Sequence, residues 1–437
     1  MRASSSLGIT LLLMSCGSTD GGLQDSGVVI TCPAPTGAGV SHSGTISASE
    51  TWKAADGPHL VTFDVDVSHG ATLTIEPCAD VRVKAGYTLV VEGTLIAEGT
   101  AAKPITLEAD DPAKPWGFMQ VFAPGTIRLA YATLSNAGAE MTNAYGALEA
   151  RGDQALPAQE ILKVDHVTVR NSVNYGVSLR SGAAFTADSQ ALTVTGSALE
   201  PLRILPRLAT NLPTGTYTGN TSDGIRVETE SYGDVNVENV TFHDRGVPYF
   251  IGGPYTFGEL VVGPGAYTLT LEAGVVFKFK KNGGLRAESN NGSTGLIVAS
   301  GTQAKPVVFT SLEAAPAAGD WRGIELGSVP GAFAFDHVEV HYAGGASQSS
   351  GHHCQPNPAV TGEQSHDDDA SLAIYHQPGH AYLTNSLIAD SAGDAVDLAY
   401  QGSYVDFKPT NTFTNVASCQ VTLPLPTAGL CPNQGCP

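Results

Sequence analysis

The chain contains two copies of one sequence unit, and this duplication limits the folds open to it. The matching segments are 72–76 with 268–272, 99–106 with 301–308, 116–117 with 321–323, and 134–138 with 340–344. The four matches keep their order, and the offset between the copies grows slowly from 196 to 206 residues. Chance does not readily produce such an order, so we interpret the protein as two tandem modules with small loop insertions.

Each module is itself made of short segments with a strand pattern. Segments such as 94–99 and 166–171 alternate apolar and polar residues, which sends one side chain inward and the next toward water. Gly and Asn at the segment ends favour the left-handed backbone that sharp corners need. We expect four asparagines near strand ends to stack as an internal ladder of amides, namely Asn136, Asn171, Asn239 and Asn385.

Repeating units of this size cannot close a core alone and therefore indicate a stacked solenoid. Helical or leucine-rich repeats would need long amphipathic stretches, which the sequence lacks. A β-propeller would match itself at about 40 to 50 residues, and no such match is present. The pattern therefore predicts an all-β parallel β-helix with about 20 to 25 residues per turn.

Four strings in this pattern carry a family resemblance, namely 73–77, 94–105, 320–324 and 341–345. They resemble right-handed parallel β-helix proteins of bacterial surfaces, which have a pectin-lyase-like fold and are common among myxobacterial and related lipoproteins. The resemblance covers most of residues 50 to 418. It implies a right-handed solenoid and a place at the cell surface, and it implies no agreed activity. The chain departs from the family at Cys78, where Gly is usual, and lacks the Asp expected before Trp116.

The N-terminus has the pattern of an export signal. Arg2 is followed by a short apolar run, and Leu13-Met14-Ser15-Cys16 resembles a bacterial lipobox. In lipobox proteins the cysteine is acylated, so the resemblance implies that Cys16 is the lipidated first residue of the mature protein. The resemblance implies that the protein is exported and anchored by lipid at the bacterial cell envelope, at the outer membrane or cell surface.

The predicted organisation has five parts. They are a lipoprotein signal peptide (1–16), a flexible tether (17–45), two β-helix modules (46–235 and 236–418) and a Cys/Pro-rich tail (419–437). The tether assignment depends on the absence of an apolar period.

Six cysteines remain after Cys16, and an even number in an exported chain favours disulfides. We expect a bridge between Cys32 and Cys78 near the start. The other four should tie a loop and the tail together near the end, and they are Cys354, Cys419, Cys431 and Cys436. A zinc site would need thiolates that converge in space, and it stays the alternative.

The net charge of −20 argues against nucleic acid as a partner, because the field of the molecule repels phosphate backbones. It is compatible with divalent cations and with neutral glycans.

One stretch looks unlike the solenoid and carries potential metal ligands. The candidates are His352, His353, His366, Asp367, Asp368 and Asp369. Imidazoles suit a transition metal and the aspartates alone suit Ca²⁺. The expectation is a protein without a cofactor, with Ca²⁺ as the one candidate. The alternative is a solvated insertion loop that is held by a disulfide bond of Cys354.

Carbohydrate chemistry is the other candidate. Tyr249, Tyr255 and Phe257, with Phe250 beside them, are candidate sugar-stacking residues near the junction of the modules. Asp390, Asp394 and Asp397 form the best carboxylate cluster for a lyase or hydrolase, with Arg170 and Arg180 as the basic residues on strands. The competing interpretations are that these aromatic residues belong to the core and that these aspartates cap turns.

The expected function is therefore a non-enzymatic cell-envelope lipoprotein whose β-helix displays or binds something, with polysaccharide as the candidate ligand. A carbohydrate-active enzyme and a purely structural spacer are the alternatives. An enzyme should show carboxylates converging with Arg or Lys from three adjacent turns, whereas a display protein should show a smooth face.

Overall fold

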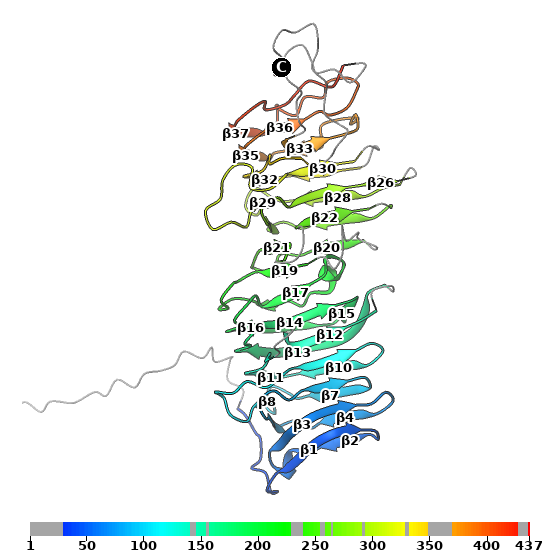
Figure 1. The fold of residues 1–437 in the computed structure, drawn as a ribbon, viewed down its shortest axis with the longest axis vertical. Coiled ribbons are helices and arrows are strands. Elements are labelled where there is room, and N and C mark those ends of the chain that lie inside the picture. Colours follow the sequence, from blue (N-terminus) through cyan, green and yellow to red (C-terminus); the bar gives the residue numbers. More distant parts are fainter. Residues whose placement is uncertain are drawn as a thin grey trace, which may run out of the picture.

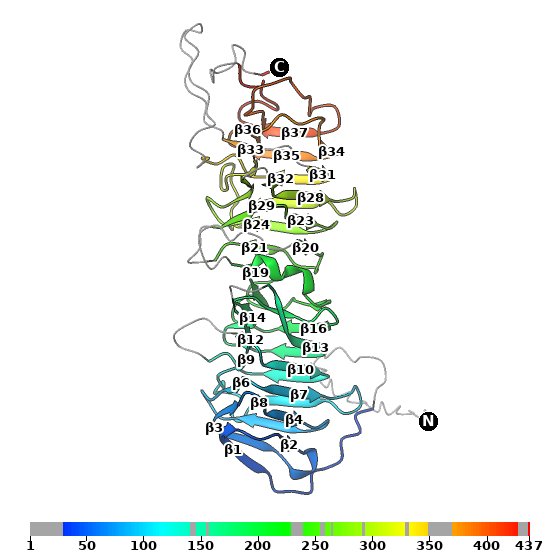
Figure 2. The ribbon, with the colours of Figure 1, turned by 90° about the vertical axis from the view of Figure 1, so that its right-hand side faces the viewer.

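The computed structural model describes residues 29–139, 146–153, 157–228, 239–253, 258–263, 265–290, 293–327, 332–347, 369–426 and 436–437. The chain winds into a long rod in which strands stack one above another along the axis (Figure 1). The same stacking is visible after a quarter turn (Figure 2). Pairing between the named strands of this described part is parallel, except in the small hairpin β26 (Ser289–Asn290) and β27 (Ser293–Thr294). The prediction of an all-β parallel β-helix is confirmed.

Three runs of stacked strands form the first module. One run is β2 (Glu50–Trp52), β4 (Thr72–Ile75), β7 (Thr94–Glu98), β10 (Thr126–Ala130), the first part of β13 (Gln159–Arg170) and β15 (Ala183–Phe185). The second is β1 (Val40–Ile46), β3 (His59–Val67), β5 (Asp80–Val83), β8 (Ile105–Ala109), β11 (Ala132–Ser135), the rest of β13, β16 (Gln190–Thr195) and β18 (Gly215–Thr216). The third, which we call the third run, leaves the end of β3 and continues through β6 (Leu89–Val91), β9 (Met119–Phe122), β12 (Gly146–Arg151), β14 (Tyr175–Arg180), β17 (Leu202–Ile204) and β19 (Ile225–Val227).

The second module also has three runs. The first is β20 (Val240–Phe242), β23 (Thr268–Leu271), β28 (Leu296–Ser300), β31 (Ala334–Asp336) and β34 (Leu383–Thr384). The second is β21 (Tyr249–Ile251), β24 (Val276–Phe279), β29 (Val307–Ser311), β32 (Val338–His341), β35 (Leu387–Ser391) and β37 (Thr412–Val416). The third is β22 (Glu259–Val262), β25 (Gly284–Ala287), β30 (Ile324–Leu326), β33 (Ala370–Ile374) and β36 (Asp394–Asp397).

The two modules are joined through different runs. Strand β21 pairs with β19 on one side and with β24 on the other. By the sequence duplication, β24 corresponds to β5, which lies in the second run of the first module. The third run of the first module therefore continues into the second run of the second. The predicted module boundary at 235/236 itself lies outside the described residues.

The dry interior comes from the period-two pattern. In β7, Leu95 and Ala97 are completely buried while their neighbours are partly exposed. The register places Leu95 between Leu73 and Ile127 of the adjacent turns, so identical positions stack along the axis. Each turn covers the apolar face of the next, which no turn can do alone.

Corners have the left-handed backbone that the sequence predicts, but with a wider choice of residues. Asn136 and Asn171 have φ of 57° and 54° and occupy the same corner of successive turns. Tyr131, His166 and His337 adopt left-handed φ as well, and the rings of Tyr131 and His166 stack at 4.6 Å. The sequence rule for corners therefore finds the asparagines and misses these aromatic residues.

The predicted internal asparagine ladder is wrong. The side chains of Asn171, Asn239 and Asn385 are exposed, and Asn136 is half-buried. Asn385 donates to Oδ1 of Asp336 at 2.8 Å instead of to another asparagine. At Asn136, Asn171 and Asn385 the left-handed backbone turns the amides away from the apolar interior.

The short helices are η1 (Ala54–Asp56) and η2 (Pro206–Asn211). No helix among the described residues is both long and apolar enough to cross a membrane. The predicted tether ends earlier than residue 45, because the Thr31 amide donates to the Ala102 carbonyl at 2.8 Å and β1 begins at Val40.

Candidate functional site

One register position of the third run carries polar side chains on consecutive strands. The outward residues at this position are Gln120, Glu149, Ser178, Arg203 and Arg226. Each stands between two inward apolar residues, as Arg203 does between Leu202 and Ile204. The line continues as Phe250 and Lys278 in the second module. Successive strands are about 4.7–4.9 Å apart, so these groups form a ladder along the rod.

Glu149 is the most deeply buried charge-bearing group of this ladder. It has no exposed surface, and its Oε1 accepts a hydrogen bond from Nε2 of Gln120 at 3.0 Å. Its Oε2 has no hydrogen-bond partner. Burial raises the pKa of Glu149 to about 7, although the guanidinium groups of Arg180 and Arg151 act in the opposite direction. Glu149 therefore keeps its proton well above the pH at which an ordinary glutamate loses it, and it titrates around neutral pH.

Two ion pairs follow on the next strands. Arg203 Nε donates to Oε2 of Glu228 at 2.7 Å, and Arg226 pairs with Glu200. Nη1 of Arg226 also donates to the Gly252 carbonyl at 2.7 Å. In both pairs the carboxylate is the more buried partner, with side-chain exposures of 11% and 7% against 17% and 14% for the arginines.

The arginines also rest on aromatic rings. The guanidinium of Arg203 lies 5.7 Å from the ring centre of Tyr175, and that of Arg226 lies 5.3 Å from the ring centre of Phe250. These rings fix the direction of the guanidinium groups and exclude water from one side of each.

A partly exposed band of cations results, which we call the basic strip. Its members are Arg151, Arg180, Arg203, Arg226, Lys278 and Lys280. Each of them is partly exposed, whereas Glu149, Glu200 and Glu228 are buried. The surface that this face presents is therefore basic, in a chain whose net charge is −20.

Of the basic strip, only Arg180 was predicted from the sequence as a candidate site residue. A sequence pattern does mark the strip: four successive strands of the third run each have an Arg, Glu or Ser between two apolar residues. Single strands of this type look like ordinary outward positions. Only the register between strands shows that the charges form a line.

The predicted metal site lies mostly outside the described residues. His352, His353, His366, Asp367 and Asp368 are not described. Asp369 is described, and its Oδ1 accepts a hydrogen bond from the Ser347 amide at 2.7 Å. No group of three or more His, Cys, Asp or Glu side chains in the described part of the chain is placed to hold a metal ion.

The predicted sugar-stacking residues do not form an exposed platform where they are described. Tyr249 has no exposed surface, donates to the His243 carbonyl at 2.8 Å and packs edge-on against Phe242. Its ring is therefore closed to a sugar, because it belongs to the core. Tyr255 and Phe257 lie outside the described residues.

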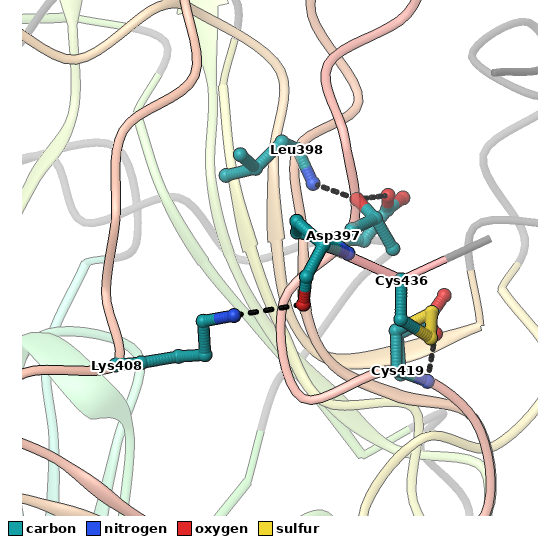
Figure 3. The surroundings of a disulfide bond; sticks show 8 residues. Asp397, Leu398, Lys408, Cys419 and Cys436 are labelled. Carbon is teal, nitrogen blue, oxygen red and sulfur yellow. Dashed lines mark hydrogen bonds between the residues drawn. A yellow bond between two sulfur atoms is a disulfide. The ribbon is translucent and has the colours of Figure 1, made fainter. Parts of the chain in front are cut away.

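Asp390, Asp394 and Asp397 serve the C-terminal turns rather than a reaction centre. Asp390 occupies a left-handed corner and accepts from Asn415 at 2.6 Å. Oδ1 of Asp394 accepts from the Cys419 amide, and Oδ1 of Asp397 accepts from the hydroxyl of Thr422 (Figure 3). Arg170 and Arg180 end β13 and β14 in the other module. The structure therefore does not bring this predicted set together.

Two disulfides lie in the described residues. Cys32 bonds to Cys78, as predicted, and Cys419 bonds to Cys436, which fastens the tail to the last turn (Figure 3). Cys354 and Cys431 lie outside the described residues, as does Cys16. Disulfides of this kind persist in oxidising compartments.

The geometry thus offers one feature with the spacing and charge of a ligand surface, the basic strip. Comparison of the chain with protein-family models, curated proteins and solved structures finds no match. Its function must therefore be argued from its own residues.

Proposed function

We propose that the protein is an exported lipoprotein, anchored through Cys16, whose basic strip binds an acidic polysaccharide without cleaving it. The observation that carries the proposal is the placement of six partly exposed cations along one face, two of which, Arg203 and Arg226, pair with buried carboxylates. A ladder of cations that follows the rod axis suits a polymer with an anionic group on each successive unit. Export is supported by the two disulfides.

A carbohydrate-active enzyme is the second candidate, and Glu149 is the observation that favours it. A carboxyl group with a pKa of about 7 beside arginines has the acidity of a general acid or base. However, a general acid must reach the substrate, and Glu149 has no exposed surface. The burial of this group is why binding without turnover is the better proposal.

The binding test uses protein lacking residues 1 to 16, titrated by calorimetry with polygalacturonate and, separately, with neutral dextran. We expect binding to polygalacturonate alone, weakening steeply with salt because the contacts are between exposed charges. Product analysis with and without Ca²⁺ should detect no new reducing or unsaturated ends. Turnover would favour the enzyme, and binding to neither polymer would favour a spacer.

The strip itself is tested with a charge-balanced variant. Replacing both ion pairs (R203Q/E228Q and R226Q/E200Q) removes two cations without changing the net charge, and should weaken polygalacturonate binding at least tenfold. The matched control is R128Q/E98Q, an exposed pair between β10 and β7 whose atoms are 2.7 Å apart. An equal loss in both variants would show that cations anywhere on the surface, and not the strip in particular, bind the polymer.

The anchor is tested in a bacterial host that lipidates exported proteins. The full-length chain should partition into the detergent phase and gain the mass of a lipid at Cys16. The C16A variant should be released in soluble form or remain unprocessed. A C16A protein that stays in the envelope fraction with its mass unchanged would contradict the lipid anchor.

A further inference from the structure

One charged side chain next to the basic strip is buried without any partner. Arg207 lies in η2 and has only 9% of its surface exposed. Its Nε and Nη2 are both buried and neither has a hydrogen-bond partner. Arg203 and Arg226, by contrast, have carboxylate partners.

An isolated buried guanidinium is costly, because it has lost its water and gained no acceptor. A native structure normally satisfies such a group, and one explanation of an exception is an ion that binds there. The two unsatisfied atoms of Arg207 are informative. Nε and Nη2 lie on the same edge of the guanidinium plane, so their hydrogens form the fork that holds one carboxylate or sulfate group by two parallel bonds.

The surroundings of Arg207 are also basic. Its Nη2 lies beside Gly182, 3.3 Å from where a Cβ atom of that residue would be. Gly182 follows Arg180 in the turn that ends β14, and Arg180 is the direct cross-strand partner of Arg151. Three arginines thus come from successive turns at one corner. We call Arg151, Arg180 and Arg207 the arginine corner.

Nε and Nη2 of Arg207 make no hydrogen bond to the acidic residues near this corner. Glu149 lies one position inside Arg151 on β12, and it is bonded to Gln120. Asp153 follows β12 and contributes its carbonyl oxygen to the wall beside Gly182. The arginine corner therefore gathers cations from three turns, and Nε and Nη2 of Arg207 there have no acceptor.

We infer that the arginine corner is an oxyanion subsite that receives a carboxylate or sulfate group of an acidic sugar chain, held bidentately by Arg207. This inference rests on the proposed function, because the corner adjoins the basic strip and would receive one unit of the same polymer. Neither donor atom touches solvent in the ligand-free chain. The Arg207 side chain must therefore turn as the anion enters. Gly182 lets the backbone pass close to Nη2, where even a Cβ atom would lie only 3.3 Å from it.

The test compares R207M with wild type, and R128M serves as the control because Arg128 is an exposed arginine of the same module. The probes are tetragalacturonate, which carries carboxylates, and sodium sulfate. R207M should bind tetragalacturonate at least tenfold more weakly and lose competition by sulfate, whereas R128M should change affinity less than twofold. R207M should also melt no lower than wild type without ligand, because it removes an unpaired buried charge and keeps an apolar stem.

Other outcomes would separate the two proposals. Unchanged tetragalacturonate affinity in R207M overturns the subsite and leaves the strip intact. Sulfate binding that depends on Arg207 without any binding of an acidic glycan overturns the proposed function and leaves an anion site. A structure at saturating tetragalacturonate with only water at Nε and Nη2 also overturns the subsite. A strong loss of melting temperature in ligand-free R207M, with unchanged affinity, would assign Arg207 a packing role instead.

Discussion

The two modules share one backbone framework but fill it differently. Nε1 of Trp116 donates to the Ser135 carbonyl at 2.9 Å, and Nε1 of Trp321 donates to the His341 carbonyl at 2.8 Å. The same antiparallel bridge closes the turn at 100–103 in one module and at 302–305 in the other. Duplication has therefore preserved hydrogen bonds that set the shape of the turn.

The cores of the modules differ in side-chain size. Val81 and Leu107 of the first module correspond to Phe277 and Phe309 of the second, and all four are completely buried. The rings of Phe277 and Phe309 meet at a right angle. A β-helix with wide turns accepts such changes if the interior stays filled, so core identity diverges while the register is kept.

The outward positions have diverged further. Gln120 corresponds to Glu325, and Glu149 corresponds to Ala373. Because the third run of the first module continues into the second run of the second, equivalent faces are not aligned along the rod. The basic strip is thus a property of one module and its junction, and not a repeated feature.

The largest expected effect comes from the paired tryptophans. Trp116→Ala and Trp321→Ala should each lower the free energy of unfolding by about 3–5 kcal/mol, since each indole is completely buried. Trp321 should cost about 1 kcal/mol more because it also stacks on Phe279 at 4.4 Å. Urea unfolding combined with amide exchange measures the loss in each module separately. A larger loss for Trp116→Ala than for Trp321→Ala would contradict the extra stabilisation assigned to the stack on Phe279.

Cys78 and Gly274 test how a corner is stabilised. They are equivalent positions with φ of 74° and 90°, so Cys78 adopts a backbone that favours glycine. Removing the 46-residue link to Cys32 should cost about 2–4 kcal/mol. C32S/C78G should be about 1 kcal/mol more stable than C32S/C78A, because only glycine adopts this backbone freely.

The same reasoning predicts that Gly274→Ala destabilises the second module, where a Cβ atom would lie 2.7 Å from Oδ2 of Asp244. Urea midpoints under matched conditions compare the variants. Equal stability of C32S/C78G and C32S/C78A would show that the left-handed corner carries no cost.

Much of the fold follows from the sequence because its signals are local and repeated. The duplicated tryptophans, the period-two strands and the Cys32–Cys78 bridge were predicted from residues alone. The basic strip was not, because it depends on which turn stacks on which. Arg203 and Arg226 look unrelated until the register places them side by side. Tyr249 was predicted to stack on a sugar, and this prediction is wrong. The junction between the modules has an apolar core, and the Tyr249 ring packs into it against Phe242.

Glu149 offers a sharper contrast between the modules. Its folded pKa of about 7 lies above the ordinary value of 4.5, so the folded chain keeps a proton that the unfolded chain has lost. Stability should therefore fall as pH rises from 4.5 to 7, and the cost is complete above pH 7. Glu149→Gln should raise the free energy of unfolding by about 3 kcal/mol at pH 8 and leave it unchanged at pH 4.

Glu325→Gln in the second module is the variant to compare with Glu149→Gln. Burial also raises the pKa of Glu325, while the nearby Arg322 and Arg286 lower it. Glu325→Gln should therefore also raise the free energy of unfolding at pH 8. Thermal melts across pH measure both variants, and a Glu149→Gln protein that is less stable at pH 8 would show that the carboxylate is ionised and bonded.

The smallest expected effect is in the first strands of the first module. His42 stacks on Trp52 at 4.1 Å, and its Nε2 shares a hydrogen bond with Nδ1 of His59 at 2.9 Å. Burial and His59 lower the pKa of His42 to about 4, while Glu50 acts in the opposite direction. The unfolded histidine gains a proton below about 6.5, but the folded one gains it only near 4.

The contribution of His42 to the free energy of unfolding should therefore be complete above pH 6.5 and should be lost as pH falls toward 4. We expect a loss of about 1 kcal/mol, because solvent screens this half-buried group. His42→Gln should remove that part of the slope, whereas His69→Gln, at an exposed position of the same module, should not. Urea midpoints at pH 7 and pH 5 measure the difference. Among the strands that the structure describes, β1 pairs only with β3, so the loss should be confined to amide exchange in these two strands. Exchange that rises equally in the second module would mean that the rod opens as one unit, and the modules would then share their stability as well as their framework.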